Sequence, residues 1–245
     1  MLRAVTLDFW NTLFVDRRGR ERERMRAECL LTELGALGIC RRAAAADEAL
    51  LAASQVYFER AWRDEHRTPA CSELVDVILT SLDARVPEDV HARIVATFER
   101  ALLAAAPDPV PNAPRVVRDL AARYRLAIIS DTGYSPGHVL RELLARHDML
   151  EPFSYLYFSN EGGASKPERC VFLQTLEALA VRPTEAAHVG DMECTDVQGA
   201  HAAGMWAVHF VGANNHDAAQ SSADVVVWRF NELPAALGSL TRAGG

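Results

Sequence analysis

Lysine is almost missing from this chain of 245 residues: of 26 basic residues, 25 are arginine and one, Lys166, is lysine. Arginine and alanine are used heavily, as GC-rich coding produces, and that bias easily replaces a surface lysine with arginine. A site that needs a compact ammonium on a thin stem resists the replacement, because the guanidinium is planar and broader. Lys166 is therefore a candidate functional residue, with a surface lysine that caps a turn as the plain alternative.

The chain also lacks an excess of positive charge and a long hydrophobic run. Its net charge of −7 disfavours non-specific binding of nucleic acid or of an anionic membrane. No hydrophobic run reaches the roughly 18 residues that a membrane span needs. We therefore expect no nucleic-acid partner and no membrane association.

Cysteine pairs are lacking as well. The five cysteines are odd in number and scattered, which is typical of reduced thiols rather than of a disulfide framework or a zinc site. Met1–Ala4 leads directly into a strand-like run, without the layout of a signal peptide. Together these features predict a cytoplasmic protein.

What is present is an ordinary globular composition, with 49% hydrophobic and 24% charged residues. This excludes a disordered chain and a coiled coil. The length permits one large domain or a main domain with an insertion. Between residues 16 and 107, hydrophobic residues recur at steps of three and four, with breaks at Gly38, Pro69 and Pro87. This pattern predicts a bundle of four helices over residues 20–37, 42–66, 70–84 and 87–105.

The rest of the chain alternates between strand-like and helix-like segments. After a proline-rich segment, 106–111, that we interpret as a stiff hinge, helices are expected over residues 113–124, 136–147, 168–180, 195–203 and 233–240. Strands are expected over residues 3–8, 126–129, 155–158, 187–189, 206–210 and 225–228. The alternation predicts an α/β fold, a Rossmann-like parallel sheet with helices on both faces. Residues 1–15 and 108–245 would form this core, and residues 16–107 an inserted helical domain.

Three of the predicted strands end in polar residues: Asp8, the triplet Ser130–Thr132, and Asp191. Ligands of open parallel sheets bind beyond the carboxyl ends of the strands, so these side chains are expected to converge. Each of them alone could simply cap a helix or make a turn. Three such ends and a single lysine together predict a functional site.

These residues resemble the four motifs of the haloacid dehalogenase-like hydrolase superfamily. The motifs are LDFWNTL at residues 7–13, IISDTG at 128–133, GGASKP at 162–167 and HVGDMECTD at 188–196. They occur in the family's order, and the helical insertion after the first motif resembles its helical cap. The resemblance implies a hydrolase whose cap closes over the site, excludes water and selects the substrate.

The resemblance implies a covalent phosphatase mechanism for this site. Asp8 would attack the phosphoryl group and form an aspartyl-phosphate, which divides one difficult step into two. Mg²⁺, a hard cation that prefers oxygen ligands, would offset the repulsion between carboxylate and phosphate. Asp8, Asp191 and the backbone carbonyl of Trp10 would be its ligands. Asp196 would bind the metal through water or support the other ligands.

The remaining motif residues, together with the side chain of Trp10, would bind the substrate. Ser130, with the amides that follow it at Asp131 and Thr132, would hold a phosphoryl oxygen. Lys166 would act as a catalytic point charge on both the nucleophile and the phosphoryl group, and Thr12 would orient the loop.

Trp10 departs from the family pattern, because phosphatases of this family carry a second aspartate there as general acid. An indole has no useful acid–base chemistry, and general acid–base help typically contributes 10²–10⁴-fold. Asn11 and Asp131 also replace the more usual Gly and Asn. Three explanations stay open: a phosphatase with another acid or a good leaving group, a 2-haloacid dehalogenase, and an inactive binding or regulatory protein.

Asp191 favours phosphoryl chemistry, since a dehalogenase attacks a neutral carbon and needs no magnesium. The retained Asp8 and Lys166 disfavour an inactive protein. We therefore predict a magnesium-dependent phosphatase of a small phosphorylated metabolite, as a monomer or homodimer, with Trp10 in place of the usual acid.

Overall fold

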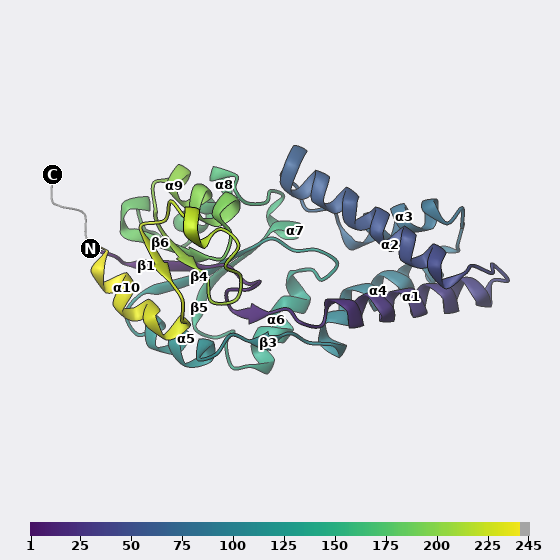
Figure 1. Ribbon diagram of the computed structural model, residues 1–245, viewed down its shortest axis with the longest axis horizontal. Helices are drawn as coiled ribbons and strands as arrows, with labels where there is room; N and C mark the ends of the chain where they lie inside the picture. The colour runs from purple at the N-terminus through teal and green to yellow at the C-terminus, as the bar shows by residue number, and fades with distance from the viewer. Residues whose placement is uncertain (241–245) are drawn as a thin grey trace. The chain divides into compact units, whose positions relative to one another are not determined.

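The chain folds into two compact units in the computed structural model, which describes residues 1–240 except the side chains of Ala61 and Trp62 (Figure 1). The first unit consists of Met1–Asp16, Asp108–Asp131 and the chain from Leu144 onward. The second consists of Arg17–Pro107 and Thr132–Leu143. We call them the sheet unit and the helical unit.

The segment Thr132–Leu143 belongs to the helical unit, whereas we had expected it within the core. Its contacts with the inserted helices explain the difference. The ring of Tyr134 lies edge-on to Phe98 at 5.7 Å, and the hydroxyl of Ser135 donates to the carbonyl of Glu99 at 3.0 Å.

The sheet unit contains a parallel six-stranded sheet in the order β5-β4-β1-β6-β7-β8, which confirms the predicted fold class. The strands are β1 (Ala4–Leu7), β4 (Arg125–Ser130), β5 (Phe153–Phe158), β6 (Ala186–Gly190), β7 (Trp206–Phe210) and β8 (Val225–Val227). Every residue of β1 is buried, as expected for a central strand that is covered on both faces.

Helices cover both faces of this sheet (Figure 1). They are α5 (Ala113–Ala121), α7 (Ser159–Gly162), α8 (Arg169–Ala178), α9 (Gln198–Ala203) and α10 (Leu233–Ser239). Alternate strand residues such as Ala127 and Ile129 pack in one cluster with Val171 and Phe172 of α8 and Ala200 of α9. Successive side chains of a strand point to opposite faces of the sheet, so each strand contributes to the hydrophobic core on both faces.

A second, two-stranded sheet was not expected from the sequence. β2 (Phe14–Val15) pairs antiparallel with β3 (Asp108–Pro109), within the segment that we interpreted as a hinge. Pro109 lacks a backbone donor, so it fits such a short pair, which needs few ladder bonds. A two-residue strand is too short to show a period in the sequence.

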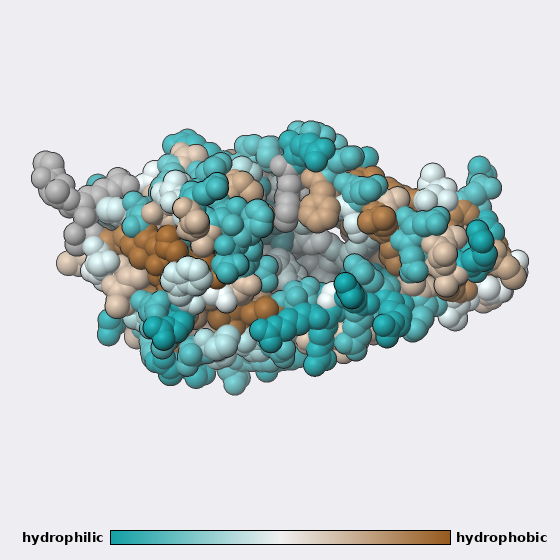
Figure 2. All heavy atoms as spheres, viewed as in Figure 1, coloured by the Kyte–Doolittle hydropathy of each residue, from teal (hydrophilic) through white to brown (hydrophobic). Residues whose placement is uncertain are grey.

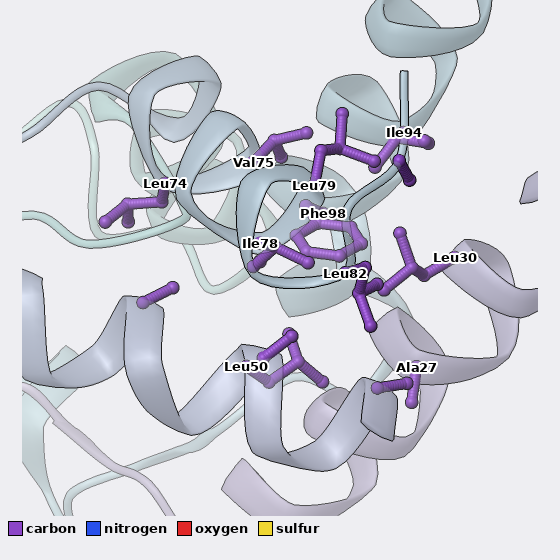
Figure 3. Close-up of a cluster of buried hydrophobic side chains, with 14 of the residues drawn as sticks. Ala27, Leu30, Leu50, Leu74, Val75, Ile78, Leu79, Leu82, Ile94 and Phe98 are labelled. Atoms are coloured by element: carbon purple, nitrogen blue, oxygen red, sulfur yellow. The ribbon is translucent and has the colours of Figure 1, made fainter. Parts of the chain in front are cut away.

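The helical unit has its own hydrophobic core (Figure 3). Its helices are α1 (Gly19–Ala36), α2 (Ala43–Phe58), α3 (Cys71–Ser81), α4 (Glu88–Ala104) and, up to Leu143, α6 (Gly137–Arg146). α2 continues into a π-helical turn at Glu59–Asp64. Leu30, Leu50, Ile78 and Phe98 come from four different helices and meet in this core. The four predicted helices are therefore present, and the sequence steps of three and four mark their buried faces.

The visible face of each unit is mostly hydrophilic (Figure 2). Large hydrophobic side chains that are exposed are few and scattered: Met1, Leu37, Leu51, Phe58, Val226 and Trp228. Among the described residues, no helix combines the length and the hydrophobicity that crossing a membrane requires.

Candidate active site at the carboxyl ends of the strands

Three adjacent strands bring the predicted site residues together in the sheet unit. β1 lies between β4 and β6, so Asp8 after β1 is flanked by Ser130 at the end of β4 and by Asp191 after β6. The amide of Asp8 donates to the carbonyl of Val189 at 2.8 Å, which fixes the chain where it leaves the sheet. All three side chains are buried.

Lys166 joins two of the aspartates. Its Nζ lies 2.5 Å from Oδ1 of Asp8 and 2.6 Å from Oδ1 of Asp196, and the side chain is 3% exposed. Burial alone would lower the pKa of Lys166, but the carboxylates of Asp196 and Asp8 raise it above its usual value. The ammonium is therefore charged and fixed, and the alternative of a surface lysine is wrong.

The carboxylates of Asp8, Asp191 and Asp196 form an acidic cluster, with one oxygen of each lying within 4.8 Å of the others. Burial raises the pKa of Asp8, and Asp196 and Asp191 raise it further against the opposing effect of Lys166. Burial and the charge of Asp196 raise the pKa of Asp191 to about 6. A cation would stabilise such crowded carboxylates, and hard oxygen donors fit Mg²⁺.

Both oxygens of Asp196 already have partners within the protein. Oδ1 lies near Lys166 and 3.1 Å from Nε2 of His188, and Oδ2 accepts from the amide of Met192 at 3.0 Å. Although burial opposes ionisation, Lys166 and His188 lower the pKa of Asp196 below its usual value. This arrangement favours the supporting role for Asp196 over direct metal ligation.

Gly190 allows Asp196 to come this close. A Cβ atom at position 190 would lie 2.2 Å from Cγ of Asp196, so a side chain at this position would displace the carboxylate. Asp196 lies on a π-helical turn at Glu193–Val197, a conformation that often occurs at functional sites. In the fourth motif, the carboxylate of Asp196 therefore packs directly against the backbone of Gly190, the residue that precedes Asp191.

Most of the chain matches a known protein family. Residues 2–204 match the family model described as haloacid dehalogenase-like hydrolase. The chain belongs to this hydrolase family.

The curated relatives of this chain include proteins that are phosphatases by name. The chain is 29% identical over 139 residues to a glyceraldehyde 3-phosphate phosphatase of Pyrococcus furiosus, covering 56% of each chain. It is 43% identical over 68 residues to a phosphoserine phosphatase of Thermus thermophilus, covering 28% of this chain and 27% of the relative. The matches thus span between about a quarter and just over half of these relatives.

Solved structures share the fold over almost the whole chain. A 2-haloacid dehalogenase of Pseudomonas syringae superposes with a TM-score of 0.71, at 22% identity, over 97% of this chain and 99% of the other. At this identity the likeness shows the fold alone.

The loop after β1 contains Trp10, the residue at which this chain departs from the family pattern. The ring of Trp10 is partly exposed and lies edge-on to Phe9 at 5.1 Å. Asn11 has a φ of 54°, in the left-handed region that Gly occupies easily and Asn tolerates, which explains why Asn can replace the usual Gly. Thr12 is fully buried, and within the described residues its hydroxyl has no hydrogen-bond partner.

The second motif is divided between the two units. Ser130 is buried and donates to the carbonyl of Asp131 at 3.1 Å, and Oδ1 of Asp131 accepts from the backbone amide of Lys166 at 3.0 Å. Asp131 thus connects the second and third motifs. Thr132, also buried, is the first residue of the segment that belongs to the helical unit. The substrate-binding roles of these residues remain predictions.

Asn214 is a site residue that we did not predict from the sequence. Its amide donates to Oδ2 of Asp191 at 2.9 Å, while the ring Nε2 of His209 lies 3.0 Å from the carbonyl oxygen of Asp191. The other ring nitrogen of His209 lies 2.8 Å from the hydroxyl of Ser221, which donates to Glu193 at 3.0 Å. The sequence does indicate the region of Asn214, because the polar loop 212–222 follows β7 at the carboxyl edge of the sheet.

Proposed function

We propose that this hydrolase is a magnesium-dependent phosphatase that cleaves a small phosphate monoester through an aspartyl-phosphate on Asp8. The observation that carries the proposal is the buried Lys166, which holds Asp8 beside the carboxylates of Asp191 and Asp196. The fixed ammonium of Lys166 can stabilise the negative charge on the oxygens of a phosphoryl group, and the carboxylate oxygens can bind a metal ion that does the same.

In the first step, Asp8 attacks phosphorus as the ester P–O bond breaks. Lys166 binds Oδ1 of Asp8, which leaves Oδ2 as the attacking oxygen, and its ammonium also neutralises a phosphoryl oxygen. Ser130 and the amides after it hold another phosphoryl oxygen. Magnesium, when bound by Asp8, Asp191 and the carbonyl of Trp10, would supply further charge neutralisation.

In the second step, water attacks the phosphorus of the aspartyl-phosphate and the P–O bond to Asp8 breaks. Inorganic phosphate leaves and the carboxylate is regenerated. Trp10 cannot deliver a proton to the leaving alkoxide or take one from this water. We therefore expect slow turnover of ordinary alkyl phosphates and faster turnover of esters whose leaving group is a weak base.

We also propose that residues 16–107 serve as the cap that selects the substrate. The support is that the segment inserted between the first and second motifs makes up most of the helical unit and forms a hydrophobic core of its own. The substrate class follows from the phosphatase chemistry and the two relatives: a small phosphorylated metabolite.

The experiment measures hydrolysis of p-nitrophenyl phosphate with Mg²⁺ and with EDTA, for the wild type and for Asp8→Asn. We expect activity that needs Mg²⁺ and is abolished in Asp8→Asn. The matched control is Asp119→Asn, because Asp119 is an exposed residue of α5 that pairs with Arg115. Hydrolysis by Asp8→Asn at the wild-type rate would contradict the covalent mechanism.

A parallel assay addresses the dehalogenase alternative, which the aromatic residue at position 10 suggests. Halide release from 2-haloacids in EDTA, without phosphate-ester hydrolysis, would overturn the proposal. Loss of both activities in a protein that Mg²⁺ still stabilises would point instead to a binding protein.

A further inference from the structure

The helical unit contains a pocket of about 220 Å³ that the proposed chemistry does not use. Its walls come from α1, from α2 and from Tyr134. The four α2 residues in the wall are Asp47, Leu50, Leu51 and Ser54, which share one face of the helix. The pocket therefore has hydrophobic, acidic and hydroxyl groups on one side and the side chains of α1 on the other.

A buried arginine lies in this pocket. Arg26 is 7% exposed, and its Nε and Nη2 reach the carbonyl oxygen of Phe98 at 3.4 and 3.3 Å. Its guanidinium also lies 4.3 Å from the ring centre of Tyr134. Within the described part of the chain, no carboxylate lies within ion-pair distance of Arg26. Its guanidinium also lies 6.0 Å from the ring centre of Phe98, and the charge of Glu23 acts on it from a longer distance. A buried charge without a carboxylate in direct contact is costly, and an anionic group in the pocket would offset that cost.

A second polar group beside Arg26 also lacks a partner. The hydroxyl oxygen of Tyr134 is buried and has no hydrogen-bond partner within 3.5 Å among the described residues. The nearby hydroxyl of Ser54, which acts on the pKa of Tyr134, donates its own proton to the carbonyl of Leu50 at 3.0 Å. A phenol is a donor that a carboxylate accepts, and a guanidinium binds a carboxylate through two parallel bonds. The inner part of the pocket thus offers the donors that recognise a carboxylate.

The outer part has the opposite charge. Glu23 and Asp47 line the pocket, are exposed, and have no ion pair among the described residues. Glu23 precedes Arg26 by three positions on α1, so both lie on the same face of that helix. Two outer carboxylates would repel a plain anion but attract an ammonium group.

We propose that this pocket binds a free α-amino acid. The carboxylate would lie on Arg26 and the Tyr134 hydroxyl, the ammonium between Glu23 and Asp47, and the side chain against Leu50 and Leu51. Such a ligand pairs both signs of charge at once, which neither a simple anion nor a simple amine does. The proposal is independent of the phosphatase chemistry, because the pocket residues all belong to the helical unit.

The first test is isothermal titration calorimetry of the full-length protein with each of the twenty common L-amino acids. We expect at least one of them to bind with a dissociation constant below about 1 mM. The N-acetyl derivative of that amino acid and the corresponding decarboxylated amine should each bind at least about tenfold more weakly, since each lacks one charged hydrogen-bonding group. Absence of binding across the set, or equal affinity for the derivatives, would overturn the proposal.

Variants then locate the binding site. The double variant Glu23→Gln/Asp47→Asn changes exposed residues, so it should fold and should bind the same amino acid at least about tenfold more weakly. The matched control, Glu21→Gln/Glu48→Gln, changes exposed acids of the same two helices outside the pocket and should bind as the wild type does. Arg26→Gln should abolish binding, with circular dichroism to check its fold.

Asp8→Asn distinguishes this pocket from the cluster at the strand ends. Binding should persist in Asp8→Asn at wild-type affinity, whether or not the protein proves to be a phosphatase. Loss of binding in Asp8→Asn, or wild-type affinity in Glu23→Gln/Asp47→Asn, would overturn the assignment to the helical unit.

Discussion

Lys166 was identified as a candidate functional residue from composition alone. Its rarity in an arginine-rich sequence marked it as functional, and the structure places it 2.5 Å and 2.6 Å from two aspartates. Lys166→Arg should lower kcat for p-nitrophenyl phosphate by about 10²–10³-fold, because the broad guanidinium does not fit both contacts. The control is Arg115→Lys at an exposed position, which should leave kcat unchanged. Near-wild-type kcat in Lys166→Arg would show that a compact ammonium is not required.

Trp10 is the residue at which the sequence predicts a functional defect. Trp10→Asp should raise kcat for alkyl phosphates by about 10²–10⁴-fold, because it supplies the missing acid–base group. Trp10→Phe keeps an aromatic ring and should give no gain. If Trp10→Asp has no effect while Asp8 remains essential, another group already performs the proton transfers.

The sequence marks the polar loop 212–222 but does not single out Asn214 within it, because the role of Asn214 depends on a contact with Asp191, 23 positions away. Asn214→Ala should raise the Mg²⁺ concentration for half-maximal activity by about 10–100-fold, since such supporting hydrogen bonds orient metal ligands. The Mg²⁺-induced rise in melting temperature should shift in parallel. Asn215→Ala, at the exposed neighbouring position, is the control. Unchanged Mg²⁺ dependence in Asn214→Ala would assign Asn214 a purely structural role.

At the scale of helices and strands, periodicity predicted the elements that have enough residues to show a period. The six strands of the main sheet and the four inserted helices are examples. The two-residue strands β2 and β3 and the π-helical turns could not be predicted, because they have no repeat of their own. The same is true of Thr132–Leu143, whose assignment to the helical unit depends on the long-range contacts of Tyr134 and Ser135.

The turn between β6 and Asp196 depends on a glycine. Gly190→Ala should abolish activity and lower stability, because the new Cβ would meet the carboxylate of Asp196. The control is Gly35→Ala in α1, where no neighbouring atom lies within 4 Å of the new Cβ. That substitution should stabilise the protein by roughly 0.5–1 kcal/mol, because alanine loses less backbone entropy in a helix. Thermal unfolding and the ester assay measure both effects, and a fully active Gly190→Ala would contradict the packing argument.

For the whole molecule, the buried acids predict a stability that depends on pH and on metal. The pKa of Asp191 rises from an ordinary value of 3.8 to about 6 on folding, so the folded state holds a proton that the unfolded state has lost. Metal-free stability should therefore fall as pH rises from about 4 to 6, by on the order of 3 kcal/mol. Mg²⁺ should restore stability above pH 6, where the carboxylate is ionised.

Melting curves in EDTA and in Mg²⁺ across this pH range, for the wild type and Asp191→Asn, measure the effect. Asp191→Asn should have a smaller slope, because the raised pKa of Asp8 remains, and it should lose most of the Mg²⁺ response. Equal melting curves for the two proteins would contradict the electrostatic account of the cluster.

The covalent mechanism requires that Asp8 becomes phosphorylated during turnover. The most direct measurement is a rapid acid quench of the wild type during hydrolysis of p-nitrophenyl phosphate with Mg²⁺, followed by peptide mass spectrometry. We expect one phosphoryl group on the wild-type peptide that contains Asp8, and none on the corresponding peptide of Asp8→Asn. An unmodified Asp8 peptide, together with undiminished ester hydrolysis by Asp8→Asn, would contradict this mechanism.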